Sequence, residues 1–272
     1  MPHIAFDRLG SGSPIILVLG AFNTRPTGAP LAAALAGHHT VINYDRRGRG
    51  GSGDDAVYAV EREIEDLDGL IRQVGGTAGV LGFSSGAALA LAAAAHGLAI
   101  TRLALFDLPL HTGAPGGAQA GPPAVDHAAA LDALVRAGRR GEAVEYFQLR
   151  MVGIPEPMVA QLRHAPFRPQ LEAMAHTLVY DARIVGDGRL PVDRARRVPC
   201  PTLAIAGAAH PFMRETAEAL ARIVPRGRAL ILDRATHDLV PDLLAPPLLQ
   251  FFAGAAGDGS SSEAHHRRDV TG

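Results

Sequence analysis

The fold of this chain is decided by the stretch Val80-Leu81-Gly82-Phe83-Ser84-Ser85-Gly86. This short apolar run breaks into Gly-x-Ser-x-Gly and continues into an alanine- and leucine-rich stretch at 87–95. A strand that turns directly into a helix has room only for small residues two positions either side of the apex, where Gly82 and Gly86 stand. The turn would lift the Ser84 hydroxyl out of a sheet and point the Ser85 N–H at a substrate carbonyl oxygen. The pattern predicts a nucleophile elbow with Ser84 as nucleophile; an ordinary Gly/Ser turn is the alternative.

The composition favours one domain that acts on a small molecule. The chain has 272 residues, of which 47% are hydrophobic, enough for an α/β domain with an inserted segment. A formal charge of −1 lacks the excess of positive charge that is typical of proteins that bind nucleic acid or an anionic membrane surface. The single cysteine, Cys200, excludes an internal disulfide and a cysteine-cluster metal site. We expect a small, roughly neutral substrate and no cofactor or metal, whereas the oligomeric state stays open.

The N-terminus shows no signal-peptide pattern, and the apolar run 15–19 is far too short to cross a bilayer. We therefore expect a cytoplasmic protein with neither a membrane nor a nucleic-acid partner.

Short apolar runs alternate with helical patterns along most of the chain. Continuous apolar strands of this length suit a parallel sheet that is covered on both faces. The order predicts a doubly wound α/β fold with a mostly parallel sheet. The expected strands are 15–19, 40–44, 79–83, 103–106, 202–206 and 229–232, and the expected helices are 30–36, 60–74, 87–96, 214–223 and 243–252.

Residues 110–197 interrupt this alternation with helical patterns and no convincing buried strand. An all-helical insertion between two strands is typical of a lid. Its Gly/Pro/Ala-rich opening, 113–123, is typical of a loop or hinge. The sequence predicts an α/β core at 1–109 and 198–253, a helical lid at 110–197 and a disordered tail at 254–272. Helices within the lid are expected at 124–137, 142–152, 157–163 and 169–179.

A serine nucleophile needs a base to take its proton, and the base needs a group that fixes its tautomer. Among twelve histidines, His237 follows the last strand-like run on a short loop before the final helical segment. We predict His237 as the base, with a solvent-exposed loop histidine as the alternative.

These features together resemble the α/β-hydrolase superfamily over nearly the whole chain, up to about residue 254. The elbow 82–86 is joined by Tyr-Asp-Arg-Arg-Gly-Arg-Gly at 44–50, which resembles the Asp-x-Arg-Gly-x-Gly turn of that family. The ending Thr-His-Asp at 236–238 and the segment 197–207, similar to the strand after the lid, complete the likeness. The resemblance implies a lidded serine hydrolase.

The resemblance also implies an acid between the serine and the histidine in the chain. The usual position, the loop 206–212, contains no carboxylate. The family's other position directly follows the strand after the elbow helix, where Asp107 stands. We therefore predict Asp107 as the acid, with a cap at a strand end as its alternative role. Asp233 and Asp238, nearer to His237 in sequence, are the competing carboxylates.

In the same family the second oxyanion donor, besides the Ser85 amide, comes from the loop after the first central strand. Here that loop is Gly20-Ala21-Phe22-Asn23, and we predict the Ala21 backbone as donor. The family often has His-Gly where this chain has Leu19-Gly20. The candidates to line a substrate pocket, each of which could equally be plain core, are Phe22, Phe83, Phe147, Met151, Phe167, Met174 and His210.

The expected function is hydrolysis of a small, mostly apolar ester or thioester through an acyl-enzyme, in the class of carboxylic ester hydrolases. The same triad could serve a carbon–carbon bond hydrolase or a tailoring enzyme of secondary metabolism. A different class, a ligand-binding scaffold without turnover, is suggested by the missing usual acid and the altered oxyanion loop.

Overall fold

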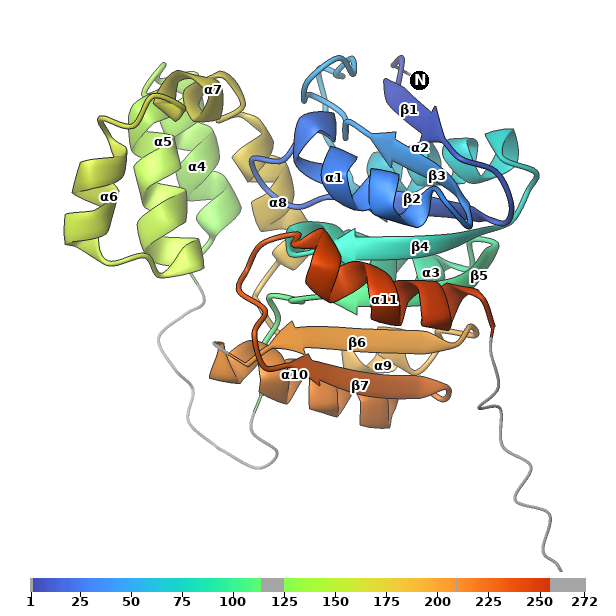
Figure 1. Ribbon diagram of the computed structural model, residues 1–272. Helices are drawn as coiled ribbons and strands as arrows, with labels where there is room; N and C mark the ends of the chain where they lie inside the picture. Colours follow the sequence, from blue (N-terminus) through green and yellow to red (C-terminus); the bar gives the residue numbers. More distant parts are fainter. Residues whose placement is uncertain (1, 114–124, 209, 255–272) are drawn as a thin grey trace, which may run out of the picture.

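In the computed structural model, which describes residues 2–113, 125–208 and 210–254, a seven-stranded sheet has the order β1-β3-β2-β4-β5-β6-β7 (Figure 1). Strand β1 pairs antiparallel with β3, and all the other pairs are parallel. The predicted doubly wound, mostly parallel sheet is confirmed. Almost all of the predicted hinge and tail lies outside the described residues. The strands are β1 (Phe6–Leu9), β2 (Pro14–Val18), β3 (Thr40–Tyr44), β4 (Ala78–Phe83), β5 (Ile100–Phe106), β6 (Thr202–Gly207) and β7 (Gly227–Leu232).

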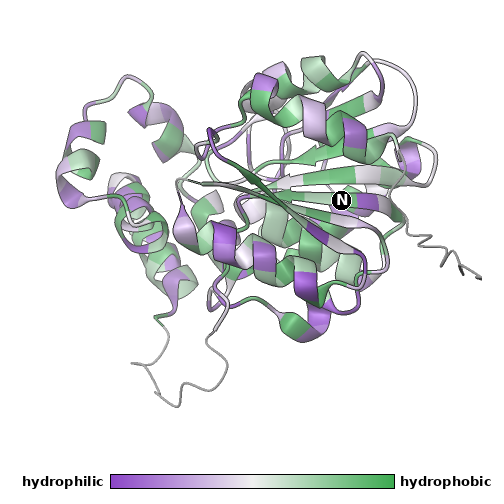
Figure 2. Ribbon diagram, turned by 60° about the horizontal axis from the view of Figure 1, so that its bottom comes forward, coloured by the Kyte–Doolittle hydropathy of each residue, from purple (hydrophilic) through white to green (hydrophobic). Residues whose placement is uncertain are grey.

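Helices cover both faces of the sheet because alternate strand residues point to opposite sides. On β2, Ile16 and Val18 pack toward one group of helices and Leu17 toward the other. In Figure 2, hydrophobic and hydrophilic residues alternate around the flanking helices, as expected of helices with one buried face. One face is covered by α1 (Arg25–Leu35) and α11 (Pro241–Phe252), and the other by α2 (Val60–Gln73), α3 (Ser85–His96), α9 (Val192–Ala195) and α10 (Pro211–Ile223).

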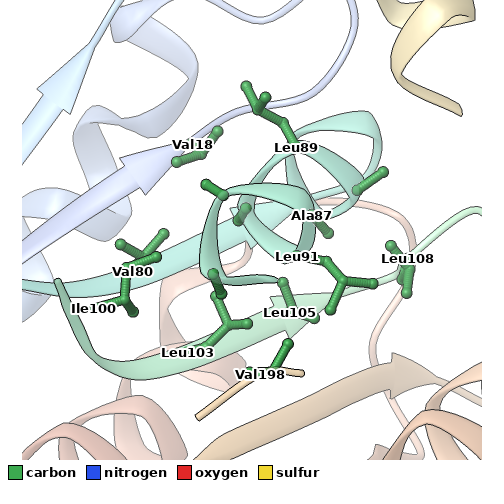
Figure 3. Packing of buried hydrophobic residues seen from close by; sticks show 14 of the residues in the cluster. Val18, Val80, Ala87, Leu89, Leu91, Ile100, Leu103, Leu105, Leu108 and Val198 are labelled. Atoms are coloured by element: carbon green, nitrogen blue, oxygen red, sulfur yellow. The ribbon is translucent and has the colours of Figure 1, made fainter. Parts of the chain in front are cut away.

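The helix after the elbow is the most deeply buried of these. Most residues of α3 are alanine, leucine or glycine, and nine of its twelve are buried. Small side chains let the helix axis approach the sheet closely, and Figure 3 shows Ala87 and Leu91 gathered over Leu103 and Leu105 of β5. The start of α3 is therefore held rigidly above the carboxyl ends of the central strands.

The sequence pattern does not predict β1. This strand lies at the sheet edge, and its central residues Asp7 and Arg8 are exposed, so it has no apolar run that would reveal it. Charged residues of this kind are typical of edge strands.

A helical insertion lies between β5 and β6, beyond the carboxyl ends of the parallel strands (Figure 1). Its helices share a hydrophobic cluster that includes Leu131, Phe147 and Leu178. The expected helix 169–179 is in fact two helices, because the Thr177 hydroxyl donates to the Met174 carbonyl at 2.8 Å and competes with a continuous helix there. Besides α9, the insertion contains α4 (His127–Arg136), α5 (Arg140–Tyr146), the π-helix η1 (Phe147–Val152), α6 (Glu156–Leu162), α7 (Arg168–Ala173) and α8 (Thr177–Val185).

Backbone crowding around the elbow explains its glycines. A Cβ at Gly86 would lie 2.2 Å from the carbonyl oxygen of Val18, and one at Gly82 would lie 2.5 Å from Cα of Ala87. Both contacts involve backbone atoms, which cannot move aside without shifting a strand or the helix.

We expect Gly86→Ala to lower the free energy of unfolding by about 2–4 kcal/mol or to prevent folding, because the added methyl group meets a strand carbonyl. Gly69→Ala is the matched control, since a Cβ there meets nothing within 4 Å in the middle of α2. The control should gain about 0.5–1 kcal/mol from helix propensity. Urea unfolding followed by circular dichroism measures both, and equal stabilities would contradict the crowding argument.

Candidate active site

Three side chains from separate strand ends form one line of hydrogen bonds. The Oγ atom of Ser84, after β4, lies 3.2 Å from Nε2 of His237, and Nδ1 of His237 lies 2.9 Å from Oδ2 of Asp107. A carboxylate only accepts hydrogen bonds, so Nδ1–H donates to Asp107 and Nε2 is left to accept the Ser84 hydroxyl proton. The structure thus brings together the three residues that the sequence singles out.

The Asp107 carboxylate is fully buried, and both of its oxygens are used. Its Oδ1 atom accepts a hydrogen bond from the Gly207 amide at 3.0 Å, while Oδ2 faces His237. The competing carboxylates point elsewhere: Asp238 accepts from the Thr236 hydroxyl at 2.9 Å, and Asp233 is exposed. Of these three carboxylates, Asp107 is the one that contacts His237.

Backbone strain is concentrated at this site. Among the described residues, the non-glycine residues with positive φ are Phe22 at 61°, Ser84 at 56° and Asp107 at 50°. They follow β2, β4 and β5, the three central strands whose carboxyl ends adjoin. Residues other than glycine rarely adopt a positive φ, and those that do cluster at functional sites.

The loop after β2 lies directly against Ser84. A Cβ at Gly20 would be 2.7 Å from Cβ of Ser84, so only glycine fits this close approach. Within the described part of the chain, neither the Ala21 amide nor the Ser85 amide donates a hydrogen bond to another protein group. Two backbone donors therefore stay available on this side of the serine.

The predicted lining residues fall into three groups. Phe83 and His210 face the His237 ring, at centroid distances of 4.9 and 6.1 Å. Phe22 meets Phe147 of the insertion edge-on at 5.5 Å. The structure does not bring the others to His237 in the same way: Met151 packs at the edge of the insertion's own cluster, Met174 is half-buried, and Phe167 is 44% exposed.

A buried ion network beside the loop after β2 was not predicted from the sequence. Arg46 pairs with Glu63 through two bonds of 2.7 Å and with Asp181 at 2.9 Å, while Arg49 pairs with Asp181 at 2.7 Å. All four side chains are at most 2% exposed. The two guanidinium groups balance the two carboxylates, as buried charges require. The arginine-rich stretch 44–50 was a signal for this network, but nothing marked its partner Asp181, more than 130 residues away in sequence.

The electrostatics favour an ionised Asp181. Burial disfavours the charged carboxylate, but the positive charges of Arg49 and Arg46 and the hydrogen bond from Ser85 outweigh burial, so the pKa of Asp181 lies below its ordinary value.

Among the residues described, no group of three or more His, Cys, Asp or Glu side chains is arranged to hold a metal ion. In the same part of the chain, no helix has the length and apolar character needed to span a membrane.

Comparison with known proteins gives a consistent result. The model of the alpha/beta hydrolase family matches residues 15–246. An alpha/beta hydrolase from Sphaerobacter thermophilus, known from its crystal structure, has 51% sequence identity to this chain. The two structures superpose with a TM-score of 0.83, and the match covers 92% of this chain and 96% of that one. No protein with a curated description is similar enough in sequence to match.

Two more distant structures share the fold. An esterase from Exiguobacterium antarcticum is 19% identical, with a TM-score of 0.65 over 93% of this chain and 94% of its own. A meta-cleavage product hydrolase from Pseudomonas fluorescens is 15% identical, with a TM-score of 0.66 over 94% of this chain and 96% of its own.

The pKa of Asp181 predicts a pH-dependent contribution to stability. The folded-state pKa is lowered, so the contribution is present above the unfolded value of about 4 and is lost as the pH falls through the folded value. At pH 7 we expect Asp181→Asn to cost about 3–5 kcal/mol, because two buried guanidinium groups lose a charged partner. The difference from the wild type should narrow when unfolding is measured at pH 3.

Asp132→Asn is the control, because Asp132 forms an exposed pair with Arg136 on α4. Its effect should stay below about 1 kcal/mol at every pH. If the difference in unfolding free energy between the wild type and Asp181→Asn stayed constant between pH 7 and pH 3, the lowered pKa of Asp181 would be refuted.

Proposed function

Because this chain belongs to the alpha/beta hydrolase family, we propose that it is a serine hydrolase that cleaves a small, mostly apolar ester or thioester through an acyl-enzyme. The observation that carries this proposal is the line of hydrogen bonds from Ser84 through His237 to Asp107. A hydroxyl, an imidazole and a buried carboxylate in this order form the arrangement that activates a serine.

In the first half-reaction, Nε2 of His237 takes the Ser84 proton while Oγ bonds to the substrate carbonyl carbon. The carbonyl oxygen becomes an oxyanion, which the amides of Ser85 and Ala21 stabilise. Asp107 holds the imidazolium in place and stabilises its charge. The intermediate then collapses: the bond to the alcohol or thiol breaks, and His237 returns the proton to that leaving group.

In the second half-reaction, water attacks the acyl-enzyme. His237 takes a proton from the water as its oxygen bonds to the acyl carbon, and the same two amides stabilise the second oxyanion. The bond to Oγ breaks, His237 protonates Ser84, and the carboxylic acid leaves. No cofactor enters either step.

Aromatic side chains around the reacting groups support a mostly apolar substrate. Phe83 packs against His237, and Phe22, which lies in the loop after β2, meets Phe147 of the helical insertion. We propose that the insertion acts as a lid, with Phe147 covering the site where it meets Phe22. His210 flanks His237, and Met151 packs within the insertion.

A carbon–carbon bond hydrolase is the second candidate, favoured by the shared fold of the meta-cleavage product hydrolase. The same three residues would serve it, and product analysis separates the two reactions. The third hypothesis, a ligand-binding scaffold without turnover, rested mainly on the missing carboxylate in the loop after β6. Asp107 lies within hydrogen-bonding distance of His237 and can take that role, which argues against this hypothesis.

We expect Ser84→Ala to reduce kcat for p-nitrophenyl butyrate by about 10⁴- to 10⁶-fold, because no other group can form the acyl-enzyme. A fluorophosphonate probe should add one label to the wild type and none to this variant, as read by intact mass. Ester turnover by Ser84→Ala at the wild-type rate would contradict the proposal.

We expect Asp107→Asn to reduce kcat by about 10³- to 10⁴-fold, since the amide leaves His237 without its fixed tautomer. Asp233→Asn and Asp238→Asn are matched controls on the His237 loop and should stay within about threefold of the wild type. Steady-state kinetics of all three variants decides which carboxylate is the acid, and a larger loss in either control would move that role away from Asp107.

A further inference from the structure

The buried ion network touches both sides of the site where the oxyanion would form. We propose that Asp181, on helix α8 of the insertion, is a positioning residue that holds the two oxyanion donors, the amides of Ser85 and Ala21, in register. This inference rests on the proposed function, because it assigns a task within that reaction.

On one side, Asp181 holds the residue next to the nucleophile. The Ser85 hydroxyl donates to Oδ1 of Asp181 at 2.7 Å, and Ser85 is 3% exposed. Ser85 is the first residue of α3, so its own amide has no partner within the helix. The side-chain hydrogen bond holds Ser85, the residue that carries this amide, against Asp181.

On the other side, Asp181 holds the loop after β2 through two arginines. Arg49 donates to Oδ2 of Asp181 at 2.7 Å and to the Gly20 carbonyl at 2.6 Å. The Gly20 carbonyl and the Ala21 amide belong to the same peptide unit, whose C=O and N–H point in opposite directions. Binding the carbonyl therefore aims the Ala21 amide away from Arg49. Arg46 adds a second contact, to the Leu19 carbonyl at 3.2 Å.

One carboxylate thus joins Ser85, which it binds directly, to the loop after β2, which it reaches through Arg49. The hydrogen bonds of this connection involve charged groups, and such bonds are shorter and stronger than neutral ones. Asp181 lies on α8, and Tyr180, the residue before it, stacks on Tyr58 with ring centroids 3.9 Å apart. The Tyr58 hydroxyl donates to Glu63 of the same network at 2.8 Å. The position of the insertion is therefore coupled to the geometry of the donors.

A second buried ion pair, between Arg47 next to Arg46 and Asp66 on α2, shows that burial alone does not explain this connection. Arg47 binds Asp66 through two bonds of 2.8 and 2.9 Å, and both side chains are at most 2% exposed. Arg47 also donates to the Arg62 carbonyl on α2, and no hydrogen bond joins this pair to Ser85 or to the loop after β2 in the described structure. Asp66 therefore offers a matched control for Asp181.

The test compares Asp181→Asn with Asp66→Asn in the full chain. For Asp181→Asn we expect kcat for p-nitrophenyl butyrate to fall about 10- to 100-fold with KM within about threefold, because misplaced donors weaken binding of the transition state and not of the ester. Hydrogen exchange of peptides spanning 19–25 and 84–88 should become faster. Asp66→Asn should lose stability but keep kcat within about threefold and leave exchange in both peptides unchanged.

If Asp181→Asn does not fold, Ser85→Ala still tests the inference. It removes one hydroxyl and leaves both arginine pairs of Asp181 in place, so we expect a folded protein with kcat reduced about three- to tenfold and KM unchanged.

The outcomes separate this inference from the proposed function. A wild type with neither ester turnover nor a Ser84 adduct would refute the proposed function, and with it the task given to Asp181. An active wild type whose folded Asp181→Asn and Ser85→Ala variants keep full kcat would refute the inference alone. Equal losses of kcat in Asp181→Asn and Asp66→Asn would also overturn it, because they would reduce Asp181 to a stabilising role.

Discussion

The contact on which the rest of this structure depends is the approach of α3 to the carboxyl ends of β2 and β4. Gly82, Gly86 and Gly20 leave no room for a Cβ, since added methyl groups would meet neighbouring atoms at 2.5, 2.2 and 2.7 Å. At the apex of this packing Ser84 has a φ of 56°, and the loop after β2 lies directly against it. Because the elbow is built from backbone packing, the direction of the Ser84 hydroxyl does not depend on a flexible loop.

Such a turn is strained, and the surrounding structure has to hold it. Residues kept at unusual φ and ψ cost of order 1–3 kcal/mol each, and Phe22, Ser84 and Asp107 all belong to this class. The buried alanines and leucines of α3, among them Ala87, Leu89 and Leu91 in Figure 3, pack against the sheet and hold the helix that follows the elbow. Charged groups support the loop after β2 from the side, where Arg49 and Arg46 bind the carbonyls that precede Ala21. Hydrophobic burial and paired buried charges thus stabilise different parts of the same site.

The position of Asp107 shows how neighbouring strands can share one task. Strands β5 and β6 are adjacent and parallel, so residues that follow them are separated by about one strand spacing, or 4.8 Å. The loop after β6 carries no carboxylate, but the amide of Gly207, the last residue of β6, donates to Asp107 at 3.0 Å and fixes the orientation of that side chain. The last residue of β6 therefore orients a carboxylate that follows the neighbouring strand β5.

The sequence by itself determined the family and the order of the central strands and helices along the chain, and it singled out Ser84 and His237 as candidate site residues. These features depend on contiguous patterns: apolar runs, helical periodicity and the small residues that a tight turn needs. The resemblance to the α/β-hydrolase superfamily also pointed to Asp107 as the acid, because that residue directly follows the strand after the elbow helix, the family's other position for the acid. Only the tertiary structure decided that Asp107 contacts His237, that β1 closes the sheet edge, and that Asp181 joins Arg46, Arg49 and Ser85. A charged residue within a helical pattern predicts an exposed surface, and only contacts between segments more than 90 residues apart make Asp181 a buried partner.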